Sequence, residues 1–283
     1  MNAIKKLLQF LSLMLIMLLA LNAGCGLKIP APKPEVRLVA DQVTIEGQPV
    51  GAMTVEEASK VLINLAKAKD VPAVNAGFAP ETGEIITERP GQRLNVSDTL
   101  NELLAAAPGS QVAPIYQQFV PDITKDKLAR SHKLGRYSTQ ILDDSPGRLA
   151  NIRLTAKLIN NTVLESGQEF SFNRLTGEPT TGRGFQPATV FGDKGKTEQG
   201  LGGGMCQVSS TLYNAVLAAN LTVTERHPHS QPVKYVPPGR DATTYTDKDF
   251  RFINTTRRRL ISRVFTDEAG SQLTVELWGL PDV

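Results

Sequence analysis

The chain has 283 residues, a formal net charge of +3, a hydrophobic fraction of 41% and two cysteines, Cys25 and Cys206. A small net charge without a long basic stripe argues against nucleic acid as a partner. If Cys25 carries a lipid, Cys206 has no partner for an intramolecular disulfide, so the fold must be stabilised by packing.

Residues 1–25 have the pattern of a secretory signal. Lys5 and Lys6 precede an apolar run over residues 7–21. The run has about 15 residues, whereas a transmembrane helix needs roughly 20, so a secretory signal is expected. The segment ends at Cys25 and resembles a lipoprotein signal, in which this cysteine carries the lipid; cleavage without lipid and an uncleaved anchor are the alternatives. We therefore expect an extracytoplasmic protein anchored to the membrane, as a lipoprotein on the outer face of the cytoplasmic membrane.

The next part of the chain is expected to form a spacer and a small domain. Residues 26–35 contain three prolines, which favour an extended spacer. Residues 36–130 alternate short strand-like runs with helical patterns, including a helix after the capping box of Thr54 and Glu57 and another near Ser97. This segment contains neither histidine nor cysteine. It is therefore predicted to be an α+β module without a catalytic cluster.

The second half, residues 131–283, is predicted to be a mixed α+β domain. Apolar residues recur at helical spacing between residues 148 and 159, and Phe170 and Phe172 alternate as one face of a strand. Residues 174–204 contain nine of the 23 glycines of the chain, which favours a loop.

A helix is expected directly after the triple glycine at positions 202–204, beginning at Met205 or Cys206. Strand patterns follow near residues 222–224, 260–264 and 273–277.

Four motifs of the second half occur in a recognisable order. They are FSFN at 170–173, GGGMCQVSSTLYN at 202–214, ERHPHS at 225–230 and GRDAT at 239–243. In this order they resemble the VanW domain, over roughly residues 134–279. The resemblance implies a bacterial cell-envelope setting and leaves the molecular activity open, because no activity is established for the family.

The first module also resembles a known domain, although through a shorter motif. FAPETGE at 78–84, followed by a leucine-containing helix, is similar to the peptidoglycan-binding domain that often precedes a VanW domain. This resemblance implies peptidoglycan or a cell-wall peptide as the partner. A plain spacer or packing domain is the alternative.

Cys206 is the candidate nucleophile. A thiol at a helix start is favoured as thiolate by the helix dipole, and His229 and Asp241 follow it in the order of papain-like and transglutaminase-like enzymes. His229 would then be the base and Asp241 the group that orients its ring, with His227 as the lesser candidate base. Against this, the 23 positions between Cys206 and His229 are few for that layout. A buried cysteine that serves only the fold is the alternative.

Ligand binding is the other chemistry that the motifs allow. The backbone N–H groups around Gly203, Gly204 and Gln207 can hold a carboxylate or an oxyanion, and Arg226 and Arg240 can add charge-assisted bonds. A salt bridge or a bond to a backbone carbonyl within the fold is the favoured explanation of each arginine.

A metal site formed by Cys206, His227 and His229 is the weakest alternative, because no second cysteine or nearby Glu motif completes a zinc site. Neither a metal nor another cofactor is expected. Three classes of function remain open: a protein that binds peptidoglycan or its peptide stems, a thiol hydrolase or transferase that acts on amide bonds of cell-wall peptides, and a non-catalytic envelope scaffold.

Overall fold

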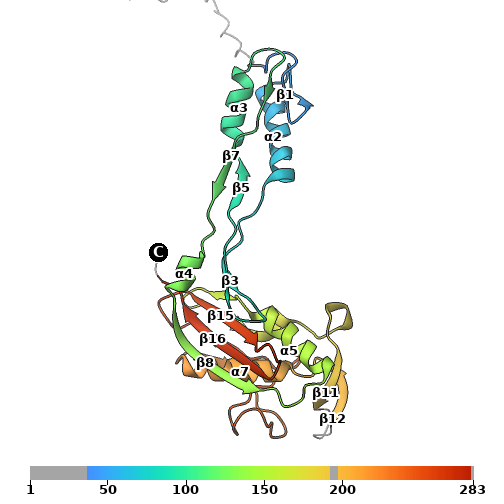
Figure 1. The fold of residues 1–283 in the computed structure, drawn as a ribbon, viewed down its shortest axis with the longest axis vertical. Helices are drawn as coiled ribbons and strands as arrows, with labels where there is room; N and C mark the ends of the chain where they lie inside the picture. The colour runs from blue at the N-terminus through green and yellow to red at the C-terminus, as the bar shows by residue number, and fades with distance from the viewer. Residues whose placement is uncertain (1–36, 192–196, 282–283) are drawn as a thin grey trace, which may run out of the picture. The chain divides into compact units, whose positions relative to one another are not determined.

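The computed structural model describes residues 37–191 and 197–281. The predicted signal, Cys25 and the proline-rich spacer lie outside the described residues. The chain forms two compact units (Figure 1), whose described parts are residues 37–63 with 96–114, and residues 64–95 with 115–281 apart from 192–196. Helices and short β-sheets together confirm the predicted α+β class.

The first unit combines a small sheet with helices. Its strands have the order β2-β1-β6, in which β1 and β2 are antiparallel and β1 and β6 are parallel. Its elements are β1 (Thr44–Ile45), β2 (Gln48–Pro49), the first part of α2 (Val55–Lys69), α3 (Val96–Ala105) and β6 (Gln111–Val112). Its buried side chains include Val39, Val43, Ile45, Val50, Ala58, Leu62 and Leu103.

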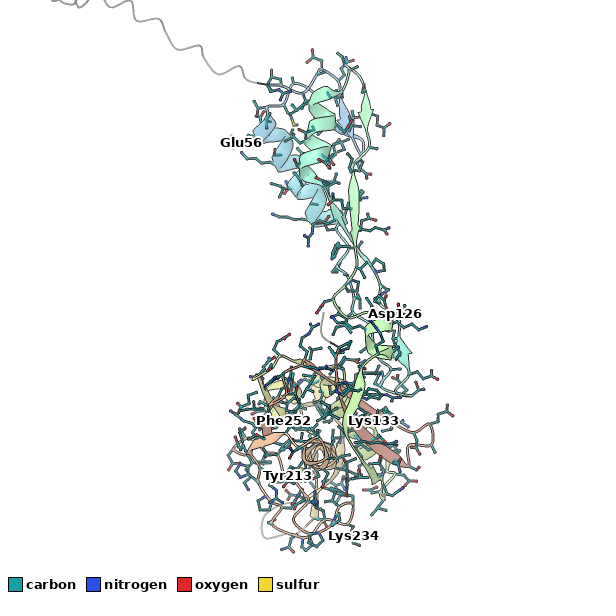
Figure 2. The ribbon with its side chains drawn as sticks, turned by 90° about the vertical axis from the view of Figure 1, so that its left-hand side faces the viewer. Glu56, Asp126, Lys133, Tyr213, Lys234 and Phe252 are labelled. Carbon is teal, nitrogen blue, oxygen red and sulfur yellow. The ribbon has the colours of Figure 1, made fainter. Side chains whose placement is uncertain are left out.

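The two helices predicted in this part of the chain are confirmed. At the start of α2, Thr54 Oγ1 accepts a hydrogen bond from the N–H of Glu57 at 3.3 Å, and Glu57 Oε2 accepts one from the N–H of Thr54 at 2.9 Å. This exchange satisfies amide groups that the first turn of a helix leaves unpaired. Glu56 lies next to the box on the exposed face of α2, where it pairs with Lys60 (Figure 2). The helix predicted near Ser97 is α3.

The second unit begins with short paired strands and a short helix. They are β3 (Gly77–Phe78), β4 (Ile85–Ile86), β5 (Gly91–Leu94), β7 (Tyr116–Phe119) and α4 (Lys125–Ala129). Asn161 Oδ1 accepts the N–H of Phe78 at 2.7 Å, and Asn160 Nδ2 donates to the carbonyl oxygen of Phe78 at 2.7 Å. One apolar cluster joins these elements to later strands through Ala76, Phe78, Ile123, Leu128, Ile261 and Leu280.

A four-stranded antiparallel sheet is the centre of the second unit. Its order is β8-β16-β15-β9, from β8 (His132–Gln140), β16 (Gln272–Gly279), β15 (Leu260–Thr266) and β9 (Val163–Leu164). Helix α7 (Met205–Ala218) packs against β8 and β16, and α5 (Pro146–Ile159) packs against β15 and α7 (Figure 1). The predicted helices after residues 148 and 204 and the strands near 260 and 273 are therefore confirmed.

A second, three-stranded sheet contributes to the same core. It has the order β10-β14-β13, from β10 (Glu169–Ser171), β14 (Arg251–Ile253) and β13 (Thr222–Glu225), with antiparallel pairing. Phe252 of β14 is buried in the core, against which half-buried Tyr213 of α7 also packs (Figure 2). Phe170 and Phe252 stack at 4.8 Å between ring centroids.

Two local predictions are wrong. Phe172 does not continue the strand, because Ser171 caps a short helix, α6 (Phe172–Thr176), by accepting the N–H of Arg174 at 3.2 Å. Both phenylalanines are buried all the same, since a strand end and a helix start can face one core. The glycine-rich segment 174–204 is not only a loop: it holds the 3₁₀ turn η1 (Thr181–Arg183) and the hairpin of β11 (Pro187–Phe191) and β12 (Thr197–Leu201).

None of the helices within residues 37–191 and 197–281 is long and apolar enough to cross a membrane.

Candidate functional site

The triple glycine has a packing role at the start of α7. A Cβ atom at Gly203 would lie 2.6 Å from the carbonyl oxygen of Thr189, so no larger residue fits there. Gly202 and Gly204 have φ angles of +80° and +113°, which glycine adopts most readily. Asn151 fixes the loop by donating from Nδ2 to the carbonyl oxygen of Gly203 at 3.0 Å. These contacts explain the glycines without a ligand.

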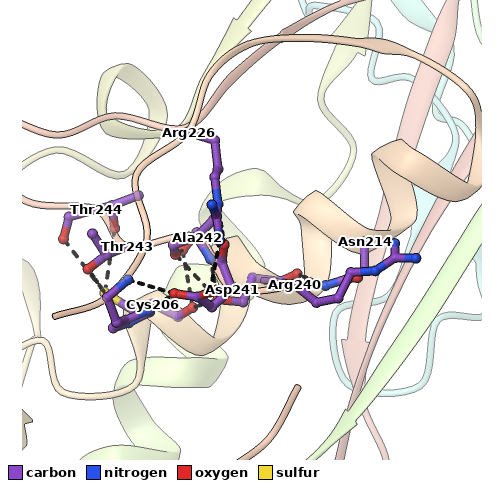
Figure 3. A network of polar contacts seen from close by, with 11 residues as sticks. Cys206, Asn214, Arg226, Arg240, Asp241, Ala242, Thr243 and Thr244 are labelled. Atoms are coloured by element: carbon purple, nitrogen blue, oxygen red, sulfur yellow. Dashed lines mark hydrogen bonds and ion pairs between the residues drawn. The ribbon is translucent and has the colours of Figure 1, made fainter. Parts of the chain in front are cut away.

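Polar side chains of α7 hold the chain segment that carries Asp241. Ser209 Oγ donates to the carbonyl oxygen of Ala242 at 2.6 Å, and Ser210 Oγ accepts the N–H of Ala242 at 2.9 Å. One turn further on, Asn214 Nδ2 donates to the carbonyl oxygen of Arg240 at 2.6 Å. These three α7 side chains are buried. The segment is therefore fixed along the helix that bears Cys206 (Figure 3).

Cys206, His229 and Asp241 form one hydrogen-bonded chain. His229 Nδ1 lies 2.7 Å from Asp241 Oδ2, and the thiol shares a side-chain hydrogen bond with His229. Because Nδ1 is engaged by Asp241, Nε2 is the ring nitrogen left for the sulfur. The side chains of His229 and Asp241 are only 7% and 12% exposed, so water competes little with these contacts. This is the arrangement of a nucleophile, a base and a group that orients the base.

Arg226 supports Asp241 from the other side. Its Nη2 donates to Asp241 Oδ1 at 2.8 Å and its Nε donates to the carbonyl oxygen of Asp241 at 2.6 Å (Figure 3). The guanidinium also lies over the ring of Tyr213 on α7, 5.5 Å from its centroid. Arg226 thereby stabilises the fold of the site and neutralises the charge of Asp241, as expected of an ion pair within the fold.

The environment of Cys206 favours the thiolate. Burial alone would raise the pKa of this thiol, but the hydrogen bond and charge of His229, with contacts to Thr244 and Thr243, lower the pKa to about 7. Thr243 Oγ1 and the carbonyl oxygen of Thr244 each lie 3.6 Å from Sγ (Figure 3). At neutral pH a large fraction of Cys206 is therefore nucleophilic.

The pKa values of His229 and Asp241 are shifted in the directions that favour their charged forms. Burial lowers the pKa of His229, but its bonds to Cys206 and Asp241 and their charges outweigh burial and raise that pKa. Burial raises the pKa of Asp241, but the N–H and ring of His229 outweigh it and hold that pKa below its usual range. The protonated ring of His229 therefore stabilises the ionic forms of Cys206 and Asp241, and both anions stabilise its positive charge.

The other predicted site residues are placed differently. His227 lies beside Glu225, with 2.9 Å between Nε2 and Oε1, rather than in the chain of Cys206. Gln207 is buried, and its amide nitrogen donates to Thr139 Oγ1 and to the carbonyl oxygen of Gln140. Arg240 is exposed, and its side chain points away from Cys206 (Figure 3).

Two polar residues that contact the first two turns of α7 carry no signal in the sequence. Tyr235 shares a side-chain hydrogen bond with Ser210, and its pKa is raised by burial and by the charge of Cys206. Arg148 of α5 donates from Nη2 to Gln207 Oε1 at 2.9 Å. Neither stands at a diagnostic spacing from the cysteine or the histidines, so only the fold identifies them.

Among residues 37–191 and 197–281, no group of three or more His, Cys, Asp and Glu side chains is arranged to hold a metal ion.

Fold and site together define an α+β protein with a thiol–imidazole–carboxylate chain at a helix start. The sequence model described as VanW like protein matches residues 147–278. An uncharacterized protein of Bacillus subtilis, YoaR, is 36% identical over 214 residues, which cover 74% of this chain and 70% of that protein. The chain belongs to the VanW family.

A second relative has a name that refers to resistance. The vancomycin B-type resistance protein VanW of Enterococcus faecalis is 32% identical over 82 residues, which cover 29% of this chain and 30% of that protein. No solved structure matches the chain significantly.

Proposed function

We propose that this chain is a thiol-dependent hydrolase or transferase that acts on amide bonds of cell-wall peptides. The hydrogen-bonded chain of Cys206, His229 and Asp241 is the observation that carries this proposal. A cysteine needed only for packing gains nothing from a buried imidazole and carboxylate, whereas a nucleophile needs both.

In the proposed reaction, the Cys206 thiolate attacks the carbonyl carbon of the amide. The resulting oxyanion is stabilised by backbone N–H groups at the start of α7. Protonated His229 gives its proton to the leaving amine as the carbon–nitrogen bond breaks, which leaves a thioester on Cys206. Water or an acceptor amine then attacks the thioester, His229 takes the proton of the attacking group, and the thiolate is released.

The setting is part of the same proposal. We place the protein outside the cytoplasm, held at the membrane by its signal or by lipid on Cys25, with peptidoglycan or its peptide stems as the partner. The signal-like pattern of residues 1–25 supports the location. The resistance named for the Enterococcus faecalis relative, together with the resemblance of residues 78–84 to a peptidoglycan-binding domain, supports the substrate.

The test measures Cys206 chemistry in a Cys25→Ser background, which leaves Cys206 as the one thiol of the chain. We expect the rate of alkylation by iodoacetamide to rise with an apparent pKa of about 7. An ordinary thiol titrates near about 8.5. We also expect the protein to change the masses of cell-wall peptides, and Cys206→Ser to abolish this change.

An inert thiol in a folded protein would overturn the proposal. If that protein still bound cell-wall fragments, a binding function would replace it. If that protein bound no cell-wall fragments, a scaffold function would replace the proposal.

A further inference from the structure

Arg148 lies against the first turn of α7, close to Cys206 in the fold. A Cβ atom at Gly204 would lie 3.4 Å from Arg148 Cγ, so the stem of the arginine runs beside this glycine. Its Nη2 reaches Gln207 Oε1 at 2.9 Å. The side chain thus contacts the residue two positions before the thiol and the residue directly after it.

Among the described residues, no acidic side chain forms an ion pair with Arg148. Within the described part of the chain, its side chain makes its hydrogen bond to a neutral amide, and its Nε is buried without a partner. No carboxylate described by the structure forms an ion pair with it, although Asp143 is near enough to feel its charge. A half-buried cation without a counter-ion is costly.

The other half-buried arginines of the second unit form ion pairs, whereas arginines without one are exposed. Arg226 pairs with Asp241, Arg251 pairs with Asp249, and Arg263 pairs with Glu276. Arg148 therefore departs from the pattern of these half-buried arginines, and its charge reaches Tyr235, which also feels the charge of Cys206.

Tyr235 provides a neutral donor in the same place. It shares a hydrogen bond with Ser210, one helical turn after Cys206, and it lies within the electrostatic reach of both Cys206 and Arg148. Burial and the charge of Cys206 raise its pKa, so its hydroxyl stays protonated. Because the Ser210 hydroxyl donates to the carbonyl oxygen of Cys206, Tyr235 donates to Ser210, and it would have to turn this proton from Ser210 to donate to an anion. A cation and a hydroxyl donor beside the nucleophile form a receptor for an anion.

We infer that Arg148, assisted by Tyr235, binds a free carboxylate of the acyl donor close to the bond that Cys206 attacks. The substrate class is then a peptide with an unblocked carboxyl group next to its scissile amide, such as a C-terminal residue or an acidic side chain. This inference rests on the proposed thiol chemistry and adds a preference for the charge of the substrate.

Two pairs of thiol reagents test the inference without the natural substrate. In each pair one reagent carries a carboxylate and the other is neutral: iodoacetate with iodoacetamide, and maleimidopropionate with N-ethylmaleimide. In the Cys25→Ser background we expect Arg148→Gln to slow at least one carboxylate reagent about tenfold. Its neutral partner should keep its rate within about twofold, because Arg148 does not activate the thiol.

Three further variants sharpen this test. Arg148→Lys keeps the charge and should lie between wild type and Arg148→Gln. Tyr235→Phe should slow the same carboxylate reagent a few-fold, about the effect of one hydrogen bond. Arg153→Gln removes an exposed arginine from the same helix and should change neither rate.

The outcomes separate this inference from the proposed function. Unchanged carboxylate-to-neutral rate ratios in folded Arg148→Gln would overturn the carboxylate site and leave the thiol chemistry standing. Slow alkylation of wild type by both neutral reagents at neutral pH would overturn the thiol chemistry itself. Thermal unfolding of each variant shows whether it is folded. If Arg148→Gln does not fold, the same rate ratios are measured on the charge-retaining variant Arg148→Lys.

Discussion

Asp241 holds His229 at two points: its Oδ2 lies 2.7 Å from Nδ1 of the ring and 2.6 Å from the backbone nitrogen of the same residue. A carboxylate that binds both the ring and the backbone fixes the tautomer and the direction of the imidazole before any substrate arrives. The pair depends in turn on α7, whose side chains hold the segment around Asp241.

Replacement of Asp241 should therefore disable the site while the fold survives. We expect Asp241→Asn to lower kcat/KM on cell-wall peptides by about 10²–10⁴-fold, because an amide can stabilise the wrong tautomer of His229 and supplies no charge to its protonated form. Steady-state kinetics measure this, and Asp144→Asn, which changes an exposed acid, is the control. Retention of nearly full activity by Asp241→Asn would remove the carboxylate from the mechanism.

Substitution of His229 should change the reactivity of Cys206, whereas substitution of His227 should not. Burial and His229 push the pKa of Cys206 in opposite directions, so His229→Gln should leave burial opposed only by the weaker contacts with Thr243 and Thr244 and raise that pKa above about 8.5, the value of a free thiol. The pH dependence of iodoacetamide labelling should then shift from neutral to alkaline pH. His227→Gln should leave the profile unchanged, since His227 contacts Glu225. Equal shifts in both variants would show that the assignment of the base is wrong.

The sequence predicted the regular elements well because their signals are local. Helix α7 follows from apolar spacing after a glycine-rich start, and the capping box of Thr54 and Glu57 is complete within four residues. The predicted strand through Phe172 failed because a local cap by Ser171 outweighed the alternating pattern. The hairpin of β11 and β12 was not predicted, because the many glycines of segment 174–204 favour a loop when the pairing partner is unknown.

The site itself could be predicted only in part. Cys206, His229 and Asp241 were identifiable as residue types in a suggestive order, but their meeting depends on hydrogen bonds between α7 and the segment at 240–242. Arg148 and Tyr235 are unremarkable in the sequence and become candidates through burial and long-range contacts. Ser209, Ser210 and Asn214 belong to a motif that is visible in the sequence. Their structural role is visible only in the fold, where they bind the backbone of residues 240 and 242.

Ser210 should be important for stability as well as for the site. Its hydroxyl donates to the carbonyl oxygen of Cys206 at 2.7 Å and accepts the N–H of Ala242 at 2.9 Å, with no exposed surface. We expect Ser210→Ala to lower the free energy of unfolding by about 1–3 kcal/mol, because the N–H of Ala242 is left buried without its acceptor. Urea unfolding measures the loss, and Ser97→Ala at an exposed position of α3 is the control. A loss no larger than that of the control would mean that Ser210 does not hold the segment.

The contacts of Glu276 indicate how the free energy of unfolding should depend on pH. Its side chain is 2% exposed and accepts from Arg263 and Lys133, each at 2.8 Å. Trp278 Nε1 donates to the same carboxylate at 2.9 Å. Burial raises the pKa of this carboxyl, but the bonds from Lys133 and Trp278 and the charge of Arg263 outweigh burial and lower it below the ordinary value of 4.5.

A carboxyl whose pKa is lower in the folded state stabilises the protein above its unfolded pKa. The contribution of Glu276 should therefore be complete at neutral pH and disappear as the pH falls below 4.5 and through the lower folded pKa. We expect Glu276→Gln to lower the free energy of unfolding at pH 7 by about 2–3 kcal/mol, because Lys133, Arg263 and the more distant Arg136 lose their counter-charge. The variant should also lose less further stability than wild type on acidification. Urea unfolding at several pH values measures both effects. Glu268→Gln, at an exposed position, is the control, and parallel pH profiles for wild type and Glu276→Gln would contradict this account.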